Sequence, residues 1–262
     1  IMEVSSQALA QRRVDPIEFS LGIFTNIGTD HTDYHGSVEN YVNAKIKLAS
    51  LSDRVLINAD DSYADHFAVA SQKKAVFYSA KDRFADYMAK NIRFSDNNVS
   101  YIILKNGGFE RFQFVGAGEI AVYNTLAAAS AADILGFDFS LSREAFSDNI
   151  EIKGRLQRIS SADKNVYIDF AHTPEALEAV LKALRAGTKG RLICVFGCGG
   201  DRDRTKREKM GLVASRFSDE VIITSDNPRT EKPEQIFSDI LKGINIKKNV
   251  VTVEDRKNAI IL

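Results

Sequence analysis

The sequence predicts an α/β protein in two parts, residues 1–153 and 154–262, and three observations support this fold class. Its 262 residues suit one large domain or two ordinary ones. Hydrophobic residues make up 44% of the chain, enough for real cores. Short apolar strands alternate with helical patterns, most regularly in the second part. That alternation is typical of a parallel sheet covered on both faces by helices.

The first part combines short strands, a hairpin and two longer helices. A helix is expected from about Glu39, where apolar residues recur at helical spacing. An alanine-rich helix from about Val122 ends near Leu135, before Gly136, a residue common at helix C-termini. Asn106-Gly107-Gly108 is a strong turn signal between two strands. The strands of this part are expected at residues 21–24, 55–57, 99–104 and 109–114.

The second part repeats a strand followed by a helix. Ligand-binding residues of such sheets gather just after the carboxyl ends of the strands. Polar loops follow three of the strands, at residues 169–172, 197–204 and 226–229. The expected strands are 166–169, 192–196, 221–224 and 250–253, and the helices are 174–185, 206–217, 233–241 and one that begins near the chain end.

Composition and charge exclude several classes of protein. Lys+Arg and Asp+Glu both number 35, so the formal net charge is zero, which argues against a broad nucleic-acid or membrane-surface footprint. No apolar run approaches the length of a membrane span, and no signal peptide is visible. Cys194 and Cys198 do not form a disulfide framework in a chain of this length, so two reduced thiols are expected.

Neither end of the chain resembles a natural terminus. The residues from Ile1 to Glu3 are interpreted as a buried strand already in progress, and those from Ile260 to Leu262 as a helix cut short. We therefore expect an internal fragment of a longer protein.

The segment from Thr25 to Gly36 follows a strand and carries two of the four histidines of the chain. Its two histidines and two aspartates could bind a divalent metal or orient a phosphate, and His31 is the better candidate because it lies closer to the strand end. A polar structural loop is the alternative interpretation, and the residues alone leave both open.

Candidate residues also precede and follow that loop. Glu3 would suit Mg²⁺, which prefers oxygen ligands, whereas Ser5 or Ser6 would cap a helix. Arg13 lies further along the same helix and could clamp an anionic substrate. Lys45 is on the apolar-faced helix, and a lysine there usually extends its amine to solvent.

Three further loops carry candidates in the second part. Asp169 and His172 are available for chemistry, although local turn hydrogen bonds would explain them equally, with Thr173 as a helix cap and Pro174 in the first turn. Glycines 197, 199 and 200 precede arginines in a loop where backbone N–H groups could approach an anion. In Asp226-Asn227-Pro228-Arg229 an acid and an arginine flank a rigid turn, which could grip the ammonium and carboxylate of an amino acid or could be a generic turn. No Walker A sequence is present.

Taken in order, these motifs resemble those of the Mur ligase family, and within it the ligases that add the third residue of the peptide. The resemblance covers essentially the whole chain, and the ordered set is specific although each motif alone is not. It rests on these segments: Glu3–Leu9, Thr25–Asn26, Asp30–His31, Asp33–Gly36, Asn43–Lys45, Asn124–Ala128, Gly154–Gln157, Asp169–Pro174 and Phe196–Asp203.

The resemblance implies a partial central ATP- and Mg²⁺-binding domain over residues 1–153 and a truncated, Rossmann-like amino-acid-binding domain over residues 154–262. The P-loop would lie upstream of Ile1, and a further amino-acid-binding stretch beyond Leu262. ATP would phosphorylate the glutamate carboxylate of UDP-N-acetylmuramoyl-L-alanyl-D-glutamate (UDP-MurNAc-L-Ala-D-Glu), and the amine of an amino acid would displace the phosphate.

The resemblance also implies the location and partners of the protein. It implies a monomeric enzyme of peptidoglycan synthesis in the bacterial cytoplasm, with no nucleic-acid or membrane partner. The piece alone is expected to be inactive.

Site roles follow from matching positions. Lys45 corresponds to the carbamylated lysine of the family, which overturns its interpretation as a solvent-directed side chain and makes it an oxygen ligand for Mg²⁺. Ala121 and Thr29 depart from the family pattern and weaken the assignments around them. The implied roles are: catalytic, Lys45, Asp169 and His172; metal-binding, Glu3, His31 and Lys45; UDP-sugar-peptide-binding, Ser5, Gln11 and Arg13; ATP-binding, Asn124, Arg155 and Asp169.

Arg202 and the stretch Asp226-Asn227-Pro228-Arg229 match the amino-acid pocket of the family. Lysine-adding relatives lack the arginine of that stretch, so Arg229 predicts a second carboxylate on the substrate, which means meso-diaminopimelate. A lysine-adding or relaxed ligase and a catalytically silent Mur-like protein that binds a nucleotide-sugar remain alternatives. A relative of folylpolyglutamate synthase is disfavoured by the two loops.

Overall fold

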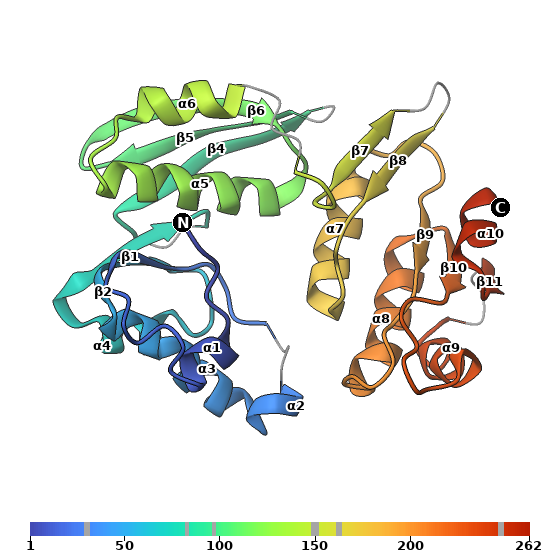
Figure 1. Ribbon diagram of the computed structural model, residues 1–262. Helices are drawn as coiled ribbons and strands as arrows, with labels where there is room; N and C mark the ends of the chain where they lie inside the picture. Colours follow the sequence, from blue (N-terminus) through green and yellow to red (C-terminus); the bar gives the residue numbers. More distant parts are fainter. Residues whose placement is uncertain (29–31, 82–83, 96–97, 148–151, 161–163, 246–248) are drawn as a thin grey trace. The chain divides into compact units, whose positions relative to one another are not determined.

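The computed structural model describes residues 1–28, 32–81, 84–95, 98–147, 152–160, 164–245 and 249–262 (Figure 1). The chain divides into two compact units, residues 1–150 and 151–262. The first unit contains a six-stranded sheet, and the second contains a three-stranded sheet and a two-stranded ribbon. Both units mix helices with strands, as the α/β prediction requires.

The sheet of the first unit follows the order of the sequence from β1 to β6. The first four strands run parallel to one another, and the last two are antiparallel to their neighbours. The strands are β1 Phe19–Phe24, β2 Ser52–Asn58, β3 Ala75–Ser79, β4 Tyr87–Ser95, β5 Asn98–Lys105 and β6 Gly108–Val115.

Helices cover both faces of this sheet, and β2 shows why. Successive residues of a strand point to opposite faces. Val55 and Ile57 pack with Phe67 in one core, whereas Leu56 packs with Leu126 in another. The helices are α1 Ser6–Ala10, α2 Thr32–His35, α3 Val38–Ser50, α4 Ala64–Ser71, the 3₁₀ helix η1 Gln72–Lys74, α5 Gly118–Ile134 and α6 Phe139–Ser147.

The predicted hairpin and alanine-rich helix are confirmed. Lys105 pairs with Gly108 across a two-residue turn in which Asn106 has φ 45° and Gly107 has φ 79°. Positive φ at both central positions matches the right-handed twist of hairpin strands and favours Asn-Gly. The helix α5 is followed by Gly136 at φ 91°, a left-handed conformation that costs glycine little.

The second unit has β10 at the centre of a parallel three-stranded sheet, with β9 and β11 at its edges. Residues of α7, α8 and α9 share one core with β9 and β10, and α10 contacts β10 and β11. The elements are β7 Gln157–Ser160, β8 Asn165–Ile168, α7 Pro174–Gly187, β9 Ile193–Phe196, α8 Thr205–Phe217, β10 Glu220–Thr224, α9 Pro233–Leu241, β11 Asn249–Val253 and α10 Arg256–Ile261.

Two expectations for the second unit are wrong. The strand predicted at 166–169 does not join the parallel sheet, because β8 pairs antiparallel with β7, a strand the sequence reasoning missed. The parallel sheet is also not covered on both faces along β9. Ile193 and Val195 are 45% and 37% exposed, because β9 is an edge strand whose other face alone packs against the helices.

Two expectations for the first unit are also wrong. Residues 1–5 form no strand, and Ile1 and Met2 are exposed, because no described strand lies beside them to pair with their backbone. Part of the expected loop 25–36 is helical, since Thr32–His35 forms α2.

Cys194 and Cys198 are free, as expected, and both are buried. Burial raises the pKa of the Cys194 thiol to about 12 and that of Cys198 to about 11, so both are unreactive. Among the described residues, no helix combines the length and apolar character needed to cross a bilayer.

Candidate functional site

In the first unit, polar side chains tie together the loops that follow β1 and β2. The Asn58 amide donates to the Thr25 carbonyl oxygen at 2.8 Å, and the Ile27 N–H donates to Asp61 Oδ2 at 2.9 Å. Because the two strands are parallel neighbours, these bonds hold the start of the Thr25–Gly28 loop at the carboxyl end of the sheet. The loop that leaves β1 is therefore anchored to the end of β2 and the residues just after it.

Asp60 holds the next loop in the same way. Its carboxylate accepts from the Ser79 hydroxyl at 2.8 Å, from the backbone N–H of Ala80 and Lys81 at 2.8 and 3.1 Å, and from the Tyr123 hydroxyl at 2.8 Å. Burial and the bond to Asp60 raise the pKa of Tyr123, so its hydroxyl stays protonated and donates.

Asp60 and Asp61 were not predicted from the sequence as functional residues. The available signal was the run Asn58-Ala59-Asp60-Asp61 directly after a strand, where strand-end residues of a parallel sheet converge.

The expected UDP-sugar residues Ser5, Gln11 and Arg13 are exposed and flank α1: Ser5 precedes it, Gln11 is its C-cap, and Arg13 lies in the turn beyond, so its expected place on the helix is wrong because α1 ends at Ala10. The Ser5 hydroxyl accepts from the Ala8 N–H at 3.1 Å, so Ser5 is the N-cap of α1, which confirms the capping interpretation. The Gln11 amide donates to the Tyr34 hydroxyl at 3.0 Å, which joins α1 to α2. These three side chains thus lie at the two ends of one short helix.

Lys45 lies on α3, the helix against which α1 packs. It is half-buried, and burial lowers the pKa of its amine. Its Nζ lies 5.4 Å from the centre of the Tyr41 ring. A lowered pKa increases the share of neutral amine, which is the form that reacts with electrophiles.

Of the other expected metal ligands, Glu3 is exposed before α1, and His31 lies outside the described residues. The described part of the chain holds no group of three His, Cys, Asp or Glu side chains arranged as a metal site.

The expected nucleotide residues are divided between the units. Asn124 is exposed on α5 of the first unit. In the second unit the Arg155 guanidinium lies 4.8 Å from the centre of the Phe170 ring. Such stacking holds the planar cation in one orientation. His172 is exposed, and its Nδ1 lies 3.1 Å from the Phe170 carbonyl oxygen.

Both oxygens of Asp169 bind backbone groups. One accepts from the Leu156 N–H at 2.7 Å and the other from the Ala171 N–H at 2.8 Å. The local hydrogen bonding considered for this residue is therefore present. Leu156 has φ 44°, a conformation that needs such support, and the bond fixes the turn that carries Arg155.

The glycine loop 197–204 and the loop 226–229 interlock in the second unit. A Cβ atom on Gly197 would lie 2.1 Å from the Thr224 carbonyl oxygen, and one on Gly200 would lie 1.8 Å from the Pro228 carbonyl oxygen. Only glycine allows the two backbones to approach so closely. The Gly200 N–H also donates to the Asn227 carbonyl oxygen at 2.8 Å.

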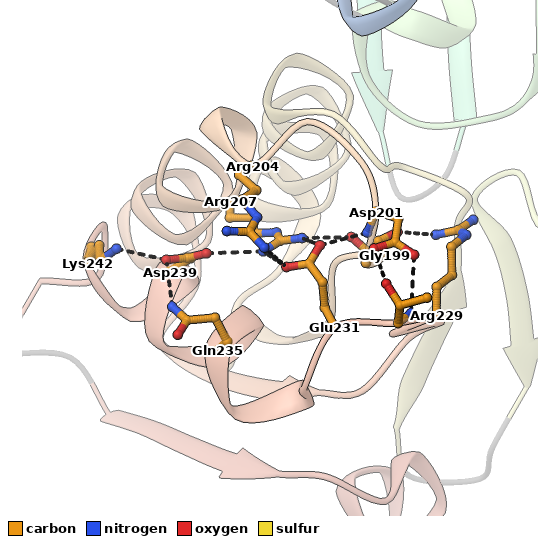
Figure 2. A network of polar contacts seen from close by, with 11 residues as sticks. Gly199, Asp201, Arg204, Arg207, Arg229, Glu231, Gln235, Asp239 and Lys242 are labelled. Carbon is orange, nitrogen blue, oxygen red and sulfur yellow. Dashed lines mark hydrogen bonds and ion pairs between the residues drawn. The ribbon is translucent and has the colours of Figure 1, made fainter.

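This contact places the two expected recognition arginines on adjoining loops. Arg229 has φ 51°, and its Nη1 donates to the Gly200 carbonyl oxygen at 2.6 Å. Within the described residues its Nε and Nη2 make no hydrogen bond, so that edge can meet a carboxylate. Arg202 is exposed, with Nη1 3.5 Å from the Asp201 carbonyl oxygen. Figure 2 shows Arg229 reaching toward the glycine loop.

An open hollow of about 490 Å³ adjoins Asp226 at the carboxyl ends of β10 and β11. Its charged lining consists of three carboxylates and one guanidinium, with Arg256 Nη2 3.8 Å from Asp226 Oδ1. A zwitterion would find partners for both of its charges here. The lining residues are Ser225, Asp226, Glu254, Asp255 and Arg256.

Comparison with known proteins adds to this geometry. Residues 1–132 match the family model for the Mur ligase middle domain, and residues 154–262 match the model for the Mur ligase glutamate ligase domain. The UDP-N-acetylmuramoyl-L-alanyl-D-glutamate–2,6-diaminopimelate ligase of Trichormus variabilis is 43% identical over 267 residues, covering 99% of the chain and 54% of the relative. The enzyme of the same name from Caldanaerobacter subterraneus is 42% identical over 264 residues, with the same coverage. The chain thus spans about half the length of the curated relatives it matches.

Solved structures agree with these matches. A UDP-N-acetylmuramoyl-L-alanyl-D-glutamate–2,6-diaminopimelate ligase superposes with a TM-score of 0.65 at 36% identity, covering 98% of the chain and 54% of that structure. A pseudomurein peptide ligase type C from Methanothermus fervidus gives a TM-score of 0.77 at 21% identity over 95% of the chain and 55% of that structure, which supports the fold alone.

Proposed function

The chain belongs to the Mur ligase family, and on that premise we propose that it is part of the ATP-dependent ligase that joins meso-diaminopimelate to UDP-MurNAc-L-Ala-D-Glu. The observation that carries the proposal is the interlocked pair of loops bearing Arg202 and Arg229. They lie in a chain about 42% identical, over nearly its whole length, to ligases named for that amino acid. Fold, relatives and site chemistry agree.

Amino-acid selection would rest on the second unit. The Nε–Nη2 edge of Arg229 offers two parallel donors, which match a carboxylate better than any single donor does. Arg202 would hold a carboxylate from the adjoining loop, and Asp226 would attract the ammonium. Asn227 and Pro228 fix the turn between them. A lysine substrate would leave one guanidinium without its carboxylate and would bind less well.

The reaction begins with attack of a D-glutamate carboxylate oxygen on the γ-phosphorus of ATP, which releases ADP and leaves an acyl phosphate. The amine of diaminopimelate then attacks the acyl carbon, phosphate departs, and the amine loses a proton as the amide forms. Positioning and charge neutralisation supply most of such catalysis. Asn124 and Arg155 would orient the nucleotide, with His172 near the phosphates.

Asp169 would act on the nucleotide through the turn that it holds. Its carboxylate already accepts from the N–H next to Arg155, so its contribution is to aim that guanidinium. Ser5, Gln11 and Arg13 would contact the UDP-sugar peptide from the two ends of α1, where all three are exposed. We propose further that the enzyme is a monomer of the bacterial cytoplasm that takes small-molecule substrates.

The donors available in the first unit fit Mg²⁺, which prefers oxygen ligands and keeps several waters and substrate phosphates. Glu3 would supply one carboxylate, and His31 is a further expected ligand. The neutral amine of Lys45 would react with CO₂, forming an N–C bond and losing a proton, to give a carbamate with a second ligating oxygen. When bound, the ion would neutralise the phosphate charge. The lowered pKa of Lys45 supports this role.

Phosphate release by the full-length protein tests the proposal. With UDP-MurNAc-L-Ala-D-Glu and ATP present, we expect release to depend on added meso-diaminopimelate and lysine to support it poorly. Lys45→Ala should abolish phosphate release with either amino acid. Equal use of lysine would favour a lysine-adding or relaxed ligase. Absence of release with either amino acid would favour a silent protein and refute the proposal.

A further inference from the structure

Beneath the two recognition loops lies a buried arginine that touches neither solvent nor the hollow. The side chain of Arg207, on α8, is 0% exposed. Its Nη2 donates to Glu231 Oε1 at 2.8 Å and its Nη1 to Glu231 Oε2 at 3.0 Å, which is a two-pronged pairing. It also donates to Asp239 Oδ2 at 3.1 Å and to the Gly199 carbonyl oxygen at 3.3 Å. Figure 2 shows Arg207 between these partners.

The partners of Arg207 belong to three different elements. Gly199 is in the glycine loop, Asp239 is on α9, and Glu231 lies two residues after Arg229. A single guanidinium therefore holds both recognition loops against one helix. Its rigid fork of donors makes such a multiple contact directional, which an ammonium group would not.

Glu231 extends the contact to two further residues of the glycine loop, Asp201 and Arg204. Its Oε1 also accepts from the Asp201 N–H at 2.7 Å, and its Oε2 accepts from Arg204 at 2.8 Å. In return, Thr230 donates through its hydroxyl to Asp201 Oδ1 at 2.7 Å. Two of the residues bonded in this way, Asp201 and Thr230, are the immediate neighbours of Arg202 and Arg229. Movement of Glu231 would therefore shift both arginines.

Stability alone is a weak reason for such a pair. Burying two charges costs several kcal/mol of solvation, and well-packed apolar residues often replace buried ion pairs without loss. What an apolar replacement cannot provide is a fixed register between two loops. Misplacement of a recognition group by about 1 Å can cost about a hundredfold in rate. Supporting contacts of this kind set how well a site discriminates.

We propose that the Arg207–Glu231 pair is a positioning device that sets the spacing of Arg202 and Arg229, and thereby the preference for an amino acid with a second carboxylate. This inference rests on the proposed function and names two residues that act through others. Neither touches the substrate. Their substitution is expected to change selectivity as well as stability.

Glu231→Gln in the full-length enzyme, with Asp239→Asn as the matched control, tests the proposal. Glutamine keeps the size of Glu231 but turns one acceptor into an NH₂ group that faces Arg207. Asparagine weakens the same arginine's contact to α9 and leaves both loops untouched. For Glu231→Gln we expect kcat/KM with diaminopimelate to fall about 10- to 100-fold, mainly through KM, with lysine affected much less. The diaminopimelate-to-lysine ratio should stay within about twofold for Asp239→Asn.

Two further measurements separate positioning from folding. All assays are run at a temperature below the unfolding midpoint of the least stable variant. The KM for ATP should be unchanged in both Glu231→Gln and Asp239→Asn. Amide exchange at Asp201 and Thr230 should be faster in Glu231→Gln and unaltered in Asp239→Asn. An unchanged selectivity ratio in Glu231→Gln, or an equal drop in both variants, would overturn the proposal.

Failure of the proposed function is recognised separately, because the wild type would then release no phosphate with diaminopimelate. Amide exchange alone then decides whether the pair positions the loops. Equal exchange rates at Asp201 in the two variants would overturn that claim.

Discussion

The two units hold the loops at their strand ends by different means. In the first, Asp61 accepts from backbone N–H groups, and Asp60 accepts from backbone N–H groups and from two hydroxyls. In the second, the carboxylate of Glu231 meets two guanidinium groups, one of them fully buried. The first arrangement is a set of charge-assisted hydrogen bonds, and the second is a partly buried ion-pair network.

The difference bears on what each unit is proposed to bind. Loops held through carboxylates that accept backbone N–H groups keep their shape whichever side chains they carry, which suits a surface for metal and phosphates. Loops held by a shared guanidinium are fixed relative to each other, which suits a pocket that measures the distance between two charges. Removing a partner should therefore cost more in the second unit.

The largest effect is expected for Arg207→Met. The change removes the guanidinium that pairs with both Glu231 and Asp239, so each carboxylate loses one buried partner. Breaking a buried pair costs about 3–5 kcal/mol, and the lower end applies because Arg204 and Lys242 remain as partners. Urea unfolding followed by far-ultraviolet circular dichroism measures it, since the chain has no tryptophan.

The matched control for this change is Arg216→Met. Arg216 lies on the same helix, is exposed, and should change the free energy of unfolding by no more than about 0.5 kcal/mol. If Arg207→Met and Arg216→Met lower the free energy of unfolding equally, the buried network contributes no more to stability than an exposed arginine does.

A smaller, pH-dependent effect is expected from Glu231. Its bonds to Arg207 and to the Asp201 N–H lower the pKa of its carboxyl from 4.5 to about 2. A carboxyl group whose pKa is lower in the folded than in the unfolded state stabilises the fold fully at pH values above the unfolded pKa. For Glu231 that contribution is lost as the pH falls from 4.5 through about 2. The difference in unfolding midpoint between wild type and Glu231→Gln should therefore narrow over this range. If the unfolding midpoints of the two proteins change with pH in parallel, Glu231 does not have the lowered pKa.

Asp60→Asn should have the smallest effect of the three. Asparagine keeps one acceptor but turns an NH₂ group toward the donors of Ala80 and Lys81, so about 2 kcal/mol of stability should be lost. Asp53→Asn, an exposed change on β2, the strand that ends two residues before Asp60, should be nearly neutral. A loss as large as that for Arg207→Met would remove the contrast between the units.

Much of the fold could be predicted because local signals were strong. Asn106-Gly107 and Thr173-Pro174 fix a turn and a helix start through their own conformational preferences, and both are confirmed. The strand β8 was assigned to the wrong sheet, because pairing depends on a distant partner, β7, that carries no clear pattern of its own. Exposure along β9 likewise depends on which helices pack against an edge strand.

The site was predictable in part for a related reason. Strand-end position marks out Arg202 and Arg229, since β9 and β10 are parallel and their carboxyl ends meet at one edge, whereas Asp169 follows β8, which lies outside that sheet. It does not separate a residue that would touch the substrate from one that holds a loop, and Arg207 and Glu231 were not recognised. Nothing local shows that Arg207 is buried, because its burial arises from contacts made 24 and 32 residues away.

The most direct test of the central claim is the selectivity of Arg229→Ala. The ratio of kcat/KM for meso-diaminopimelate to that for lysine is measured in the full-length enzyme, with Arg191→Ala, an exposed arginine before β9, as control. If the guanidinium of Arg229 binds the second carboxylate, the ratio should fall at least about 10-fold while lysine use is retained. An unchanged ratio, or equal loss with both amino acids, would contradict the account.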